Sequence, residues 1–173
     1  MKKLREWTND IPMDLILVAG LSIVLFIFLT IFFRHLAKNE EKRIRKKIHA
    51  LVKDAAELTP DEFFSLRNKK VANTGKKASS IGTFSGVYVL YNYTKDMIYV
   101  GQAKDIFSRV NNHFTGHGNG DVYADYKYGD RFTVRLIALE GSGFKTLNEL
   151  ERNAIATYDA VGKGYNKTKG NRG

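Results

Sequence analysis

Six polar residues in the second half of the chain carry side chains suited to chemistry at a charged, oxygen-rich group. They are Tyr88, Tyr99, Arg109, His113, Glu151 and Asn166. Tyrosine and histidine can transfer protons, arginine binds anionic oxygen atoms, and a carboxylate holds a hard cation. Such a set can act on an anionic, oxygen-rich group, provided that the fold brings the residues together.

Glu151 is the most informative of the six. Residues 144–159 predict an amphipathic helix whose buried face comprises Leu147, Leu150, Ala154, Ile155 and Tyr158. At about 100° per residue, Glu151 falls within this face, whereas Glu149 falls nearly opposite, in solvent. A buried carboxylate is costly unless it binds a metal, an arginine or a hydrogen-bonding cluster. A divalent cation shared with phosphate oxygens would satisfy Glu151, and a structural pairing with Arg109 is the alternative.

The two tyrosines lie on predicted strands. Residues 85–101 predict a hairpin, with the segment from Asn92 to Asp96 as its turn. Because alternate residues of a strand share a face, Tyr88 and Tyr99 can point to the same side of the sheet. Gly86 and Gly101 flank that face and let a backbone or a phosphate approach closely. Two ordinary sheet tyrosines are the alternative.

Arg109 and His113 lie on a predicted helix over residues 104–115. They are four residues apart, so they project from one side, flanking a stripe formed by Ile106, Val110 and Phe114. A guanidinium at the rim of a site suits a phosphate oxygen. The alternative is a surface cation beside a boundary histidine.

Further elements complete a small domain. Residues 121–128 predict a short helix and residues 131–139 a third strand, so the order is β-β-α-α-β-α. A hairpin implies antiparallel pairing. We therefore expect an α/β domain of the α+β type, with a small three-stranded antiparallel sheet flanked by helices.

These residues resemble a known family. Gly86-Val87-Tyr88 and Tyr99-Val100-Gly101 are similar to the two tripeptides that name the GIY-YIG nucleases, with Val in place of Ile in each. The resemblance covers about residues 84–168. It also includes the further motifs Arg109 with His113, Lys127-Tyr128-Gly129 before the third strand, the L-E-x-x-x-I pattern at Glu151, and Gly164-Tyr165-Asn166.

The resemblance implies an endonuclease that cleaves DNA with one divalent ion, Mg²⁺ or Mn²⁺, held by Glu151. Arg109 would stabilise the transition state, and Tyr88 or Tyr99 would act as general base with help from His113 through a hydrogen bond or a proton relay. Asn166 would position the site or the substrate. Gly86, Gly101 and His117 are weaker candidates for positioning the substrate; an ordinary exposed loop residue is the alternative for His117.

The N-terminal part predicts a membrane anchor. Leu15 to Phe33 is a run of nineteen residues without a charge, which spans roughly 28 Å as a helix. A cleaved secretory signal and a buried core helix are the alternatives. Seven Lys or Arg follow within residues 34–47, against three before residue 15. Since Lys and Arg are retained inside, we expect a single-pass protein with its N-terminus outside and its nuclease domain cytoplasmic.

Residues 34–80 carry thirteen Lys or Arg and six Asp or Glu, a net charge of +7 that favours nucleic acid or anionic membrane lipid. A helix is expected over 37–58, with an apolar stripe that can lie on the membrane, pair with another copy or pack on the C-terminal domain. A short helix after Thr59 and a flexible basic linker over 68–82 follow. The chain thus divides into a tail (1–14), a transmembrane helix (15–33), a tether (34–82) and a nuclease domain (83–173).

Two other classes of function compete with a membrane-anchored endonuclease: a non-catalytic nucleic-acid binder tethered to the membrane, and a structural membrane protein whose basic tether binds lipid. The filled set of six residues favours the enzyme. Five residues follow Thr168, so we expect no sequence-reading domain there and little sequence specificity. Incoming foreign DNA, or imported DNA that requires processing, is the expected substrate. The absence of cysteine excludes disulfides and thiolate metal sites.

Overall fold

The computed structural model describes residues 12–70, 77 and 82–170. The chain divides into a first compact unit that ends at Arg43 and a second, Ile44–Gly173. The predicted tail (1–14) and the predicted linker (68–82) lie largely outside the described residues. The second unit begins well ahead of residue 83, where the sequence places the start of the nuclease domain.

In the first unit, the apolar run is helical. Helix α2, Met13–Asp54, contains it, and the side chains of this part of the helix are exposed except that of Thr30, which is half-buried. Among the described residues, α2 is the helix that is long and apolar enough to cross a bilayer, with none of its most apolar window buried in the protein; a signal sequence meets the same test. The predicted helix over 15–33 is therefore confirmed as a helix.

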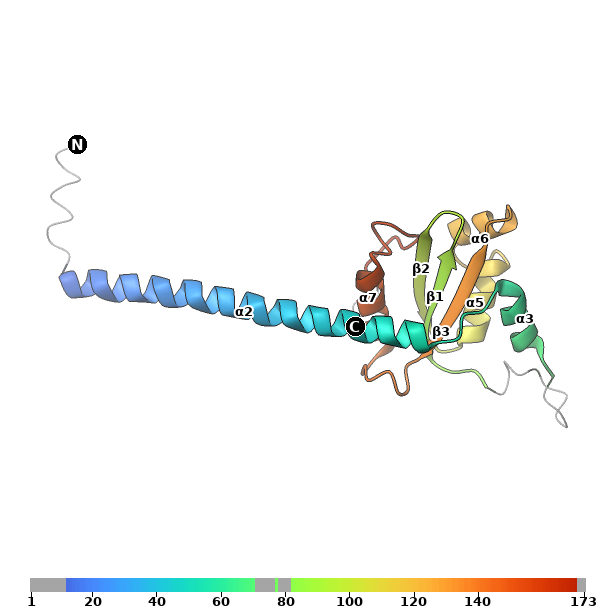
Figure 1. The fold of residues 1–173 in the computed structure, drawn as a ribbon, viewed down its shortest axis with the longest axis horizontal. Helices are drawn as coiled ribbons and strands as arrows, with labels where there is room; N and C mark the ends of the chain where they lie inside the picture. The colour runs from blue at the N-terminus through green and yellow to red at the C-terminus, as the bar shows by residue number, and fades with distance from the viewer. Residues whose placement is uncertain (1–11, 71–76, 78–81, 171–173) are drawn as a thin grey trace. The chain divides into compact units, whose positions relative to one another are not determined.

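The second unit is built on a three-stranded antiparallel sheet (Figure 1). Its strands are β1, Gly86–Asn92; β2, Met97–Ala103; and β3, Phe132–Ala138. The sheet order is β2-β1-β3, so β2 is an edge strand. Residues with high β-propensity fill the strands, and Asp96 takes the left-handed conformation that closes the hairpin. The predicted sheet and the predicted order of elements are confirmed.

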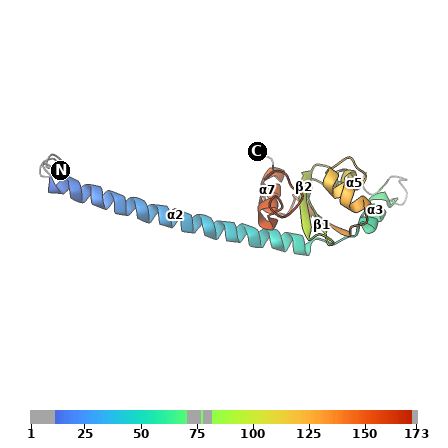
Figure 2. The same cartoon turned by 90° about the horizontal axis from the view of Figure 1, so that it is seen from above.

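Three helices cover one face of the sheet: α3, Pro60–Asn68; α5, Ile106–Phe114; and α6, Gly120–Lys127. Their apolar side chains form a core with Tyr88 and Leu90 of β1. Helix α3 is the short helix that the sequence predicts after Thr59, and Thr59 and Glu62 form a reciprocal capping box at its start. Figure 2 shows α3 and α5 on one side of the strands and α7 on the other.

The opposite face packs against helix α7, Leu147–Tyr158, and against the end of α2. Ile48 and Val52 of α2 are buried there with Val87, Val89 and Leu150. Of the three possible partners for the apolar stripe of the tether, the C-terminal domain is the one observed. Burial of a side chain such as Ile48 contributes about 1.5–3 kcal/mol, so this helical turn stabilises the domain.

Helix α2 ends at Asp54 rather than continuing to residue 58. The guanidinium of Arg135 donates to the carbonyl oxygens of Val52 and Ala55, at 3.1 and 2.7 Å, and so satisfies acceptors at the helix end. Leu58 is extended and exchanges two backbone hydrogen bonds with Val134 of β3. The helix ends here because the following residues pair with the edge strand β3.

Candidate active site

A cavity of about 300 Å³ lies beside the edge strand β2 and takes residues from both faces of the sheet. Five of the six predicted residues line it, and His113 does not. The lining includes Tyr88, Tyr99, Gly101, Gln102, Arg109, Asn119, Glu151, Asn166, Lys167, Thr168 and Gly170. An edge strand has no further strand beside it, so groups from both faces can meet across it.

The two tyrosines share one face, as predicted, and their ring centroids lie 6.1 Å apart. Tyr88 is almost fully buried, whereas Tyr99 is half-buried and lines the cavity. A Cβ atom at Gly101 would lie 2.2 Å from the hydroxyl of Tyr88, and one at Gly86 would lie 2.3 Å from the carbonyl oxygen of Ile137. At both glycines, the space that a side chain would need is therefore occupied by atoms of the protein itself.

His113 lies behind Tyr88 and is fully buried. Its Nδ1 accepts the backbone N–H of Asn119 at 2.9 Å, and its Nε2 lies 2.8 Å from the hydroxyl of Tyr88. Because Nδ1 is an acceptor, the proton of the neutral ring is on Nε2, and His113 donates to Tyr88. Burial, and then the charge of Arg109, lower the pKa of His113 to about 4. The ring is thus a fixed hydrogen-bond donor rather than a base at neutral pH.

The loop before α6 holds His113 in place. A Cβ atom at Gly118 would lie 2.6 Å from Nδ1 of His113, so only glycine lets the loop close over the ring. Asn119 follows, caps α6 through its side chain and donates its backbone N–H to His113. The sequence offers a signal for this loop, since three glycines lie within residues 116–120, but the role of Asn119 is not among the sequence predictions.

Arg109 is exposed and lies on α5, the helix that also carries His113. Burial raises the pKa of the Tyr88 hydroxyl and that of Tyr99, while the charge of Arg109 opposes both shifts by favouring the phenolate. Tyr88 is the more deeply buried of the two. Tyr99, which faces the cavity, is consequently the easier tyrosine to ionise.

Glu151 lies in the first turns of α7 and is 8% exposed, as the helical wheel predicts. Its Oε2 accepts a hydrogen bond from Nε2 of Gln102 at 2.9 Å. Glu149 is half-buried rather than in solvent, because its carboxylate turns back to accept the backbone N–H of Lys145. It does not line the cavity. Gln102 directly follows the Tyr-Val-Gly motif, and sequence reasoning did not select it.

Asn166 is held at the outer edge of β2. Its side chain accepts the N–H of Val100 at 2.9 Å and donates to the carbonyl oxygen of the same residue at 2.7 Å. The backbone N–H of Tyr165 donates to the carbonyl oxygen of Ile98. The amide of Asn166 thus replaces a neighbouring strand, and it places Lys167 and Thr168 along the cavity. These contacts support a role in positioning the site.

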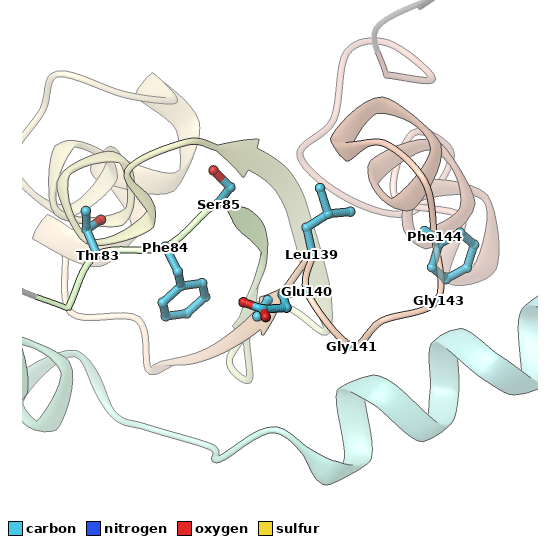
Figure 3. Close-up of a pocket in the computed structure, with 9 residues that line it drawn as sticks. Thr83, Phe84, Ser85, Leu139, Glu140, Gly141, Gly143 and Phe144 are labelled. Atoms are coloured by element: carbon cyan, nitrogen blue, oxygen red, sulfur yellow. The ribbon is translucent and has the colours of Figure 1, made fainter.

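His117 is exposed and does not line this cavity; its Nδ1 lies 3.4 Å from the hydroxyl of Thr115. Figure 3 shows a second cavity, of about 830 Å³, lined by Phe84, Glu140 and Phe144 among others. It shares no residue with the first, and Glu140 is the charged residue in its lining. The chemistry-bearing set lies at β2, away from this second cavity.

The family model described as the GIY-YIG catalytic domain matches residues 84–166. This part of the chain is a GIY-YIG nuclease domain. The matched segment runs from just before β1 to Asn166, so it contains all six residues of the predicted set. Comparisons with curated proteins and with solved structures returned no match. A GIY-YIG domain is a catalytic nuclease domain that breaks phosphodiester bonds, so the enzyme is favoured over a non-catalytic binder.

GIY-YIG nucleases generally use divalent metal ions. Glu151 offers such an ion a nearly buried carboxylate at the cavity. Among the described residues, no group of three or more Asp, Glu, His or Cys side chains is arranged to hold a metal by itself. Mg²⁺ commonly binds through one or two carboxylates, with water and substrate phosphate completing its shell. A single carboxylate is therefore a sufficient protein contribution.

Proposed function

We propose that this chain is a membrane-anchored endonuclease that cleaves phosphodiester bonds of DNA at the cytoplasmic face of the membrane, with one Mg²⁺ or Mn²⁺ held by Glu151. The observation that carries the proposal is the meeting of Tyr88, Tyr99, Arg109 and Glu151 at one cavity beside β2. Incoming foreign DNA is the substrate that such a location favours.

Within this site we assign the general base to Tyr99. Both tyrosines line the cavity, but Tyr88 is held by the Nε2–H of His113 and is almost fully buried, whereas Tyr99 is half-buried, so water can reach it. Tyr99 would remove a proton from the attacking water, whose oxygen forms the new bond to phosphorus while the ester oxygen leaves. Near neutral pH a phenol is a weak base, and the charge of Arg109 favours the phenolate that this step needs.

Arg109 would stabilise the charge that develops on the phosphoryl oxygens, since a planar guanidinium donates to two oxygens at once. Its exposed position at the cavity leaves it accessible to a large, anionic substrate. When bound, the divalent ion supplies further charge neutralisation at the same phosphate. Lys167 also lines the cavity, and its Nζ forms an ion pair with Asp121 at 2.6 Å.

The membrane part of the proposal is supported by α2 and by the charges that follow its apolar run. The helix is long enough to cross a bilayer, and seven Lys or Arg lie within residues 34–47. Basic residues beside a membrane span are retained in the cytoplasm and attract anionic lipid. The net charge of +7 over residues 34–80 also favours DNA by counterion release.

The test of this function uses matched variants of two glutamates on α7. The assay offers plasmid DNA, single-stranded DNA and RNA to the protein lacking residues 1–36. We expect Glu151→Gln to abolish the Mg²⁺- or Mn²⁺-dependent cleavage that the wild type shows. Glu149→Gln should cleave nearly as the wild type does, because Glu149 lies outside the cavity. Wild-type protein without nuclease activity in either metal, or an active Glu151→Gln variant, would contradict the assignment.

A further inference from the structure

Gln102 connects the edge strand to the helix that carries Glu151. It lies opposite Val87 in the β1–β2 ladder, so its side chain points to the face of the sheet that α7 covers. Its Nε2 donates to Oδ1 of Asn148 at 2.6 Å and to Oε2 of Glu151 at 2.9 Å. Asn148 and Glu151 are three residues apart on α7, so one amide bridges two successive turns.

The chemistry of the partners fixes the orientation of this amide. An ionised carboxylate only accepts hydrogen bonds, so Gln102 must turn its NH₂ group, not its carbonyl oxygen, toward Glu151. The two hydrogens of that group then serve the two neighbours, with Asn148 presenting its own oxygen. This pair of bonds leaves one favourable orientation for the Gln102 side chain.

We propose that Gln102 is a positioning residue that orients the carboxylate of Glu151 for binding the divalent ion; this inference rests on the metal site proposed above. Glu151 lines the cavity, where a cation can approach its carboxylate. Groups that hydrogen-bond to a metal ligand fix its orientation and tune its affinity. A neutral amide suits this place, because a lysine or arginine there would compete with the cation for the same charge.

The competing explanation is that Gln102 only joins β2 to α7. The bond to Asn148 offers a way to separate the two roles, because Asn148 does not line the cavity. If the role is structural, loss of either bond lowers the stability of the fold and leaves metal affinity unchanged. If Gln102 orients Glu151, only its own replacement weakens the binding of metal.

The experiment uses the full chain in detergent micelles and Mn²⁺ as the probe, with free Mn²⁺ followed by its electron paramagnetic resonance signal. Gln102→Met keeps the length of the side chain and removes the donor. We expect it to bind Mn²⁺ about 10- to 100-fold more weakly. The Mn²⁺ concentration for half-maximal cleavage should rise by the same factor, and saturating Mn²⁺ should restore most of the rate. Asn148→Ala, the matched control, should bind Mn²⁺ as the wild type does.

Each other outcome overturns the inference. Unchanged Mn²⁺ affinity in Gln102→Met, or an equal loss in Asn148→Ala, would show that the contact is structural. If wild-type protein binds no Mn²⁺, or if Glu151→Gln binds it equally well, the metal site itself is wrong, and the role of Gln102 with it. If Gln102→Met shows no thermal unfolding transition, Gln102→Leu replaces it, because leucine also lacks the donor. Unchanged Mn²⁺ binding in that variant would also refute the role.

Discussion

The state of His113 gives the site a measurable signature in stability. In the folded protein Nδ1 accepts from Asn119 and Nε2 donates to Tyr88, and this arrangement requires a neutral ring. Protonation of Nδ1 would place two donors against each other inside the core. We therefore predict that acidification from pH 7 to pH 5 destabilises the domain through His113, and that His113→Gln removes this contribution.

The sign and size of the effect follow from the pKa of His113, which falls from 6.5 to about 4 on folding. Between these values the unfolded chain binds the proton and the folded protein does not, so stability falls as the pH is lowered. The full loss is about 3 kcal/mol, at 1.36 kcal/mol per pKa unit. Between pH 7 and pH 5 the loss is about 2 kcal/mol.

The choice of pH range separates His113 from the acidic residues. Folding lowers the pKa of Glu57, Glu62 and Asp125. The ordinary pKa values of these carboxyl groups are 4.5 or below, so the stability that they contribute is present above those values and is lost in more acidic solution. They add little to a comparison made between pH 7 and pH 5.

The assay is urea unfolding of the protein lacking residues 1–36, followed by circular dichroism at both pH values. From pH 7 to pH 5, the free energy of unfolding should fall by about 2 kcal/mol more for the wild type than for His113→Gln. The comparison concerns pH dependence, so it holds even if the variant is less stable at both values. Equal pH dependence in the two proteins would refute the neutral, Nε2-protonated state of His113.

Two further outcomes are expected. Arg109→Ala should slow single-turnover cleavage about 10²- to 10³-fold while binding DNA almost normally, because Arg109 is assigned to charge that develops in the transition state. If Arg109→Ala lost only DNA affinity, measured across a salt series, the domain would be a binder rather than an enzyme. A reporter that is active only in the cytoplasm should be active when it is fused after Gly173, since seven Lys or Arg follow Phe33 against three before Leu15. Activity of a reporter that folds only outside the cytoplasm would contradict the predicted topology.

Much of the architecture follows from local patterns in the sequence. Runs of β-formers on either side of the segment from Asn92 to Asp96 predict the hairpin that the structure contains. Apolar spacing on the last helix places Glu151 in the buried face without knowledge of any neighbour. The short helix after Thr59 is likewise confirmed. These features depend on residues close in sequence, whose geometry the helix or strand period sets.

Other features depend on which surfaces meet, and local periodicity leaves them open. The apolar stripe at Ile48 and Val52 suits a membrane, a second copy or the domain equally well, and burial against α7 and the sheet selects the last. The end of α2 at Asp54 is set by Arg135 and by the pairing of Leu58 with β3, which are contacts across about eighty residues of sequence.

The working details of the site belong to the tertiary structure alone. Sequence reasoning selected His113 but left open a hydrogen bond or a proton relay, and the N–H of Asn119 at Nδ1 favours the first. It did not select Gln102, because nothing in a single polar residue after a glycine indicates that a helix almost fifty residues later will place Glu151 within 2.9 Å of it. Distances between segments far apart in sequence are set by how layers pack, and a linear pattern does not contain them.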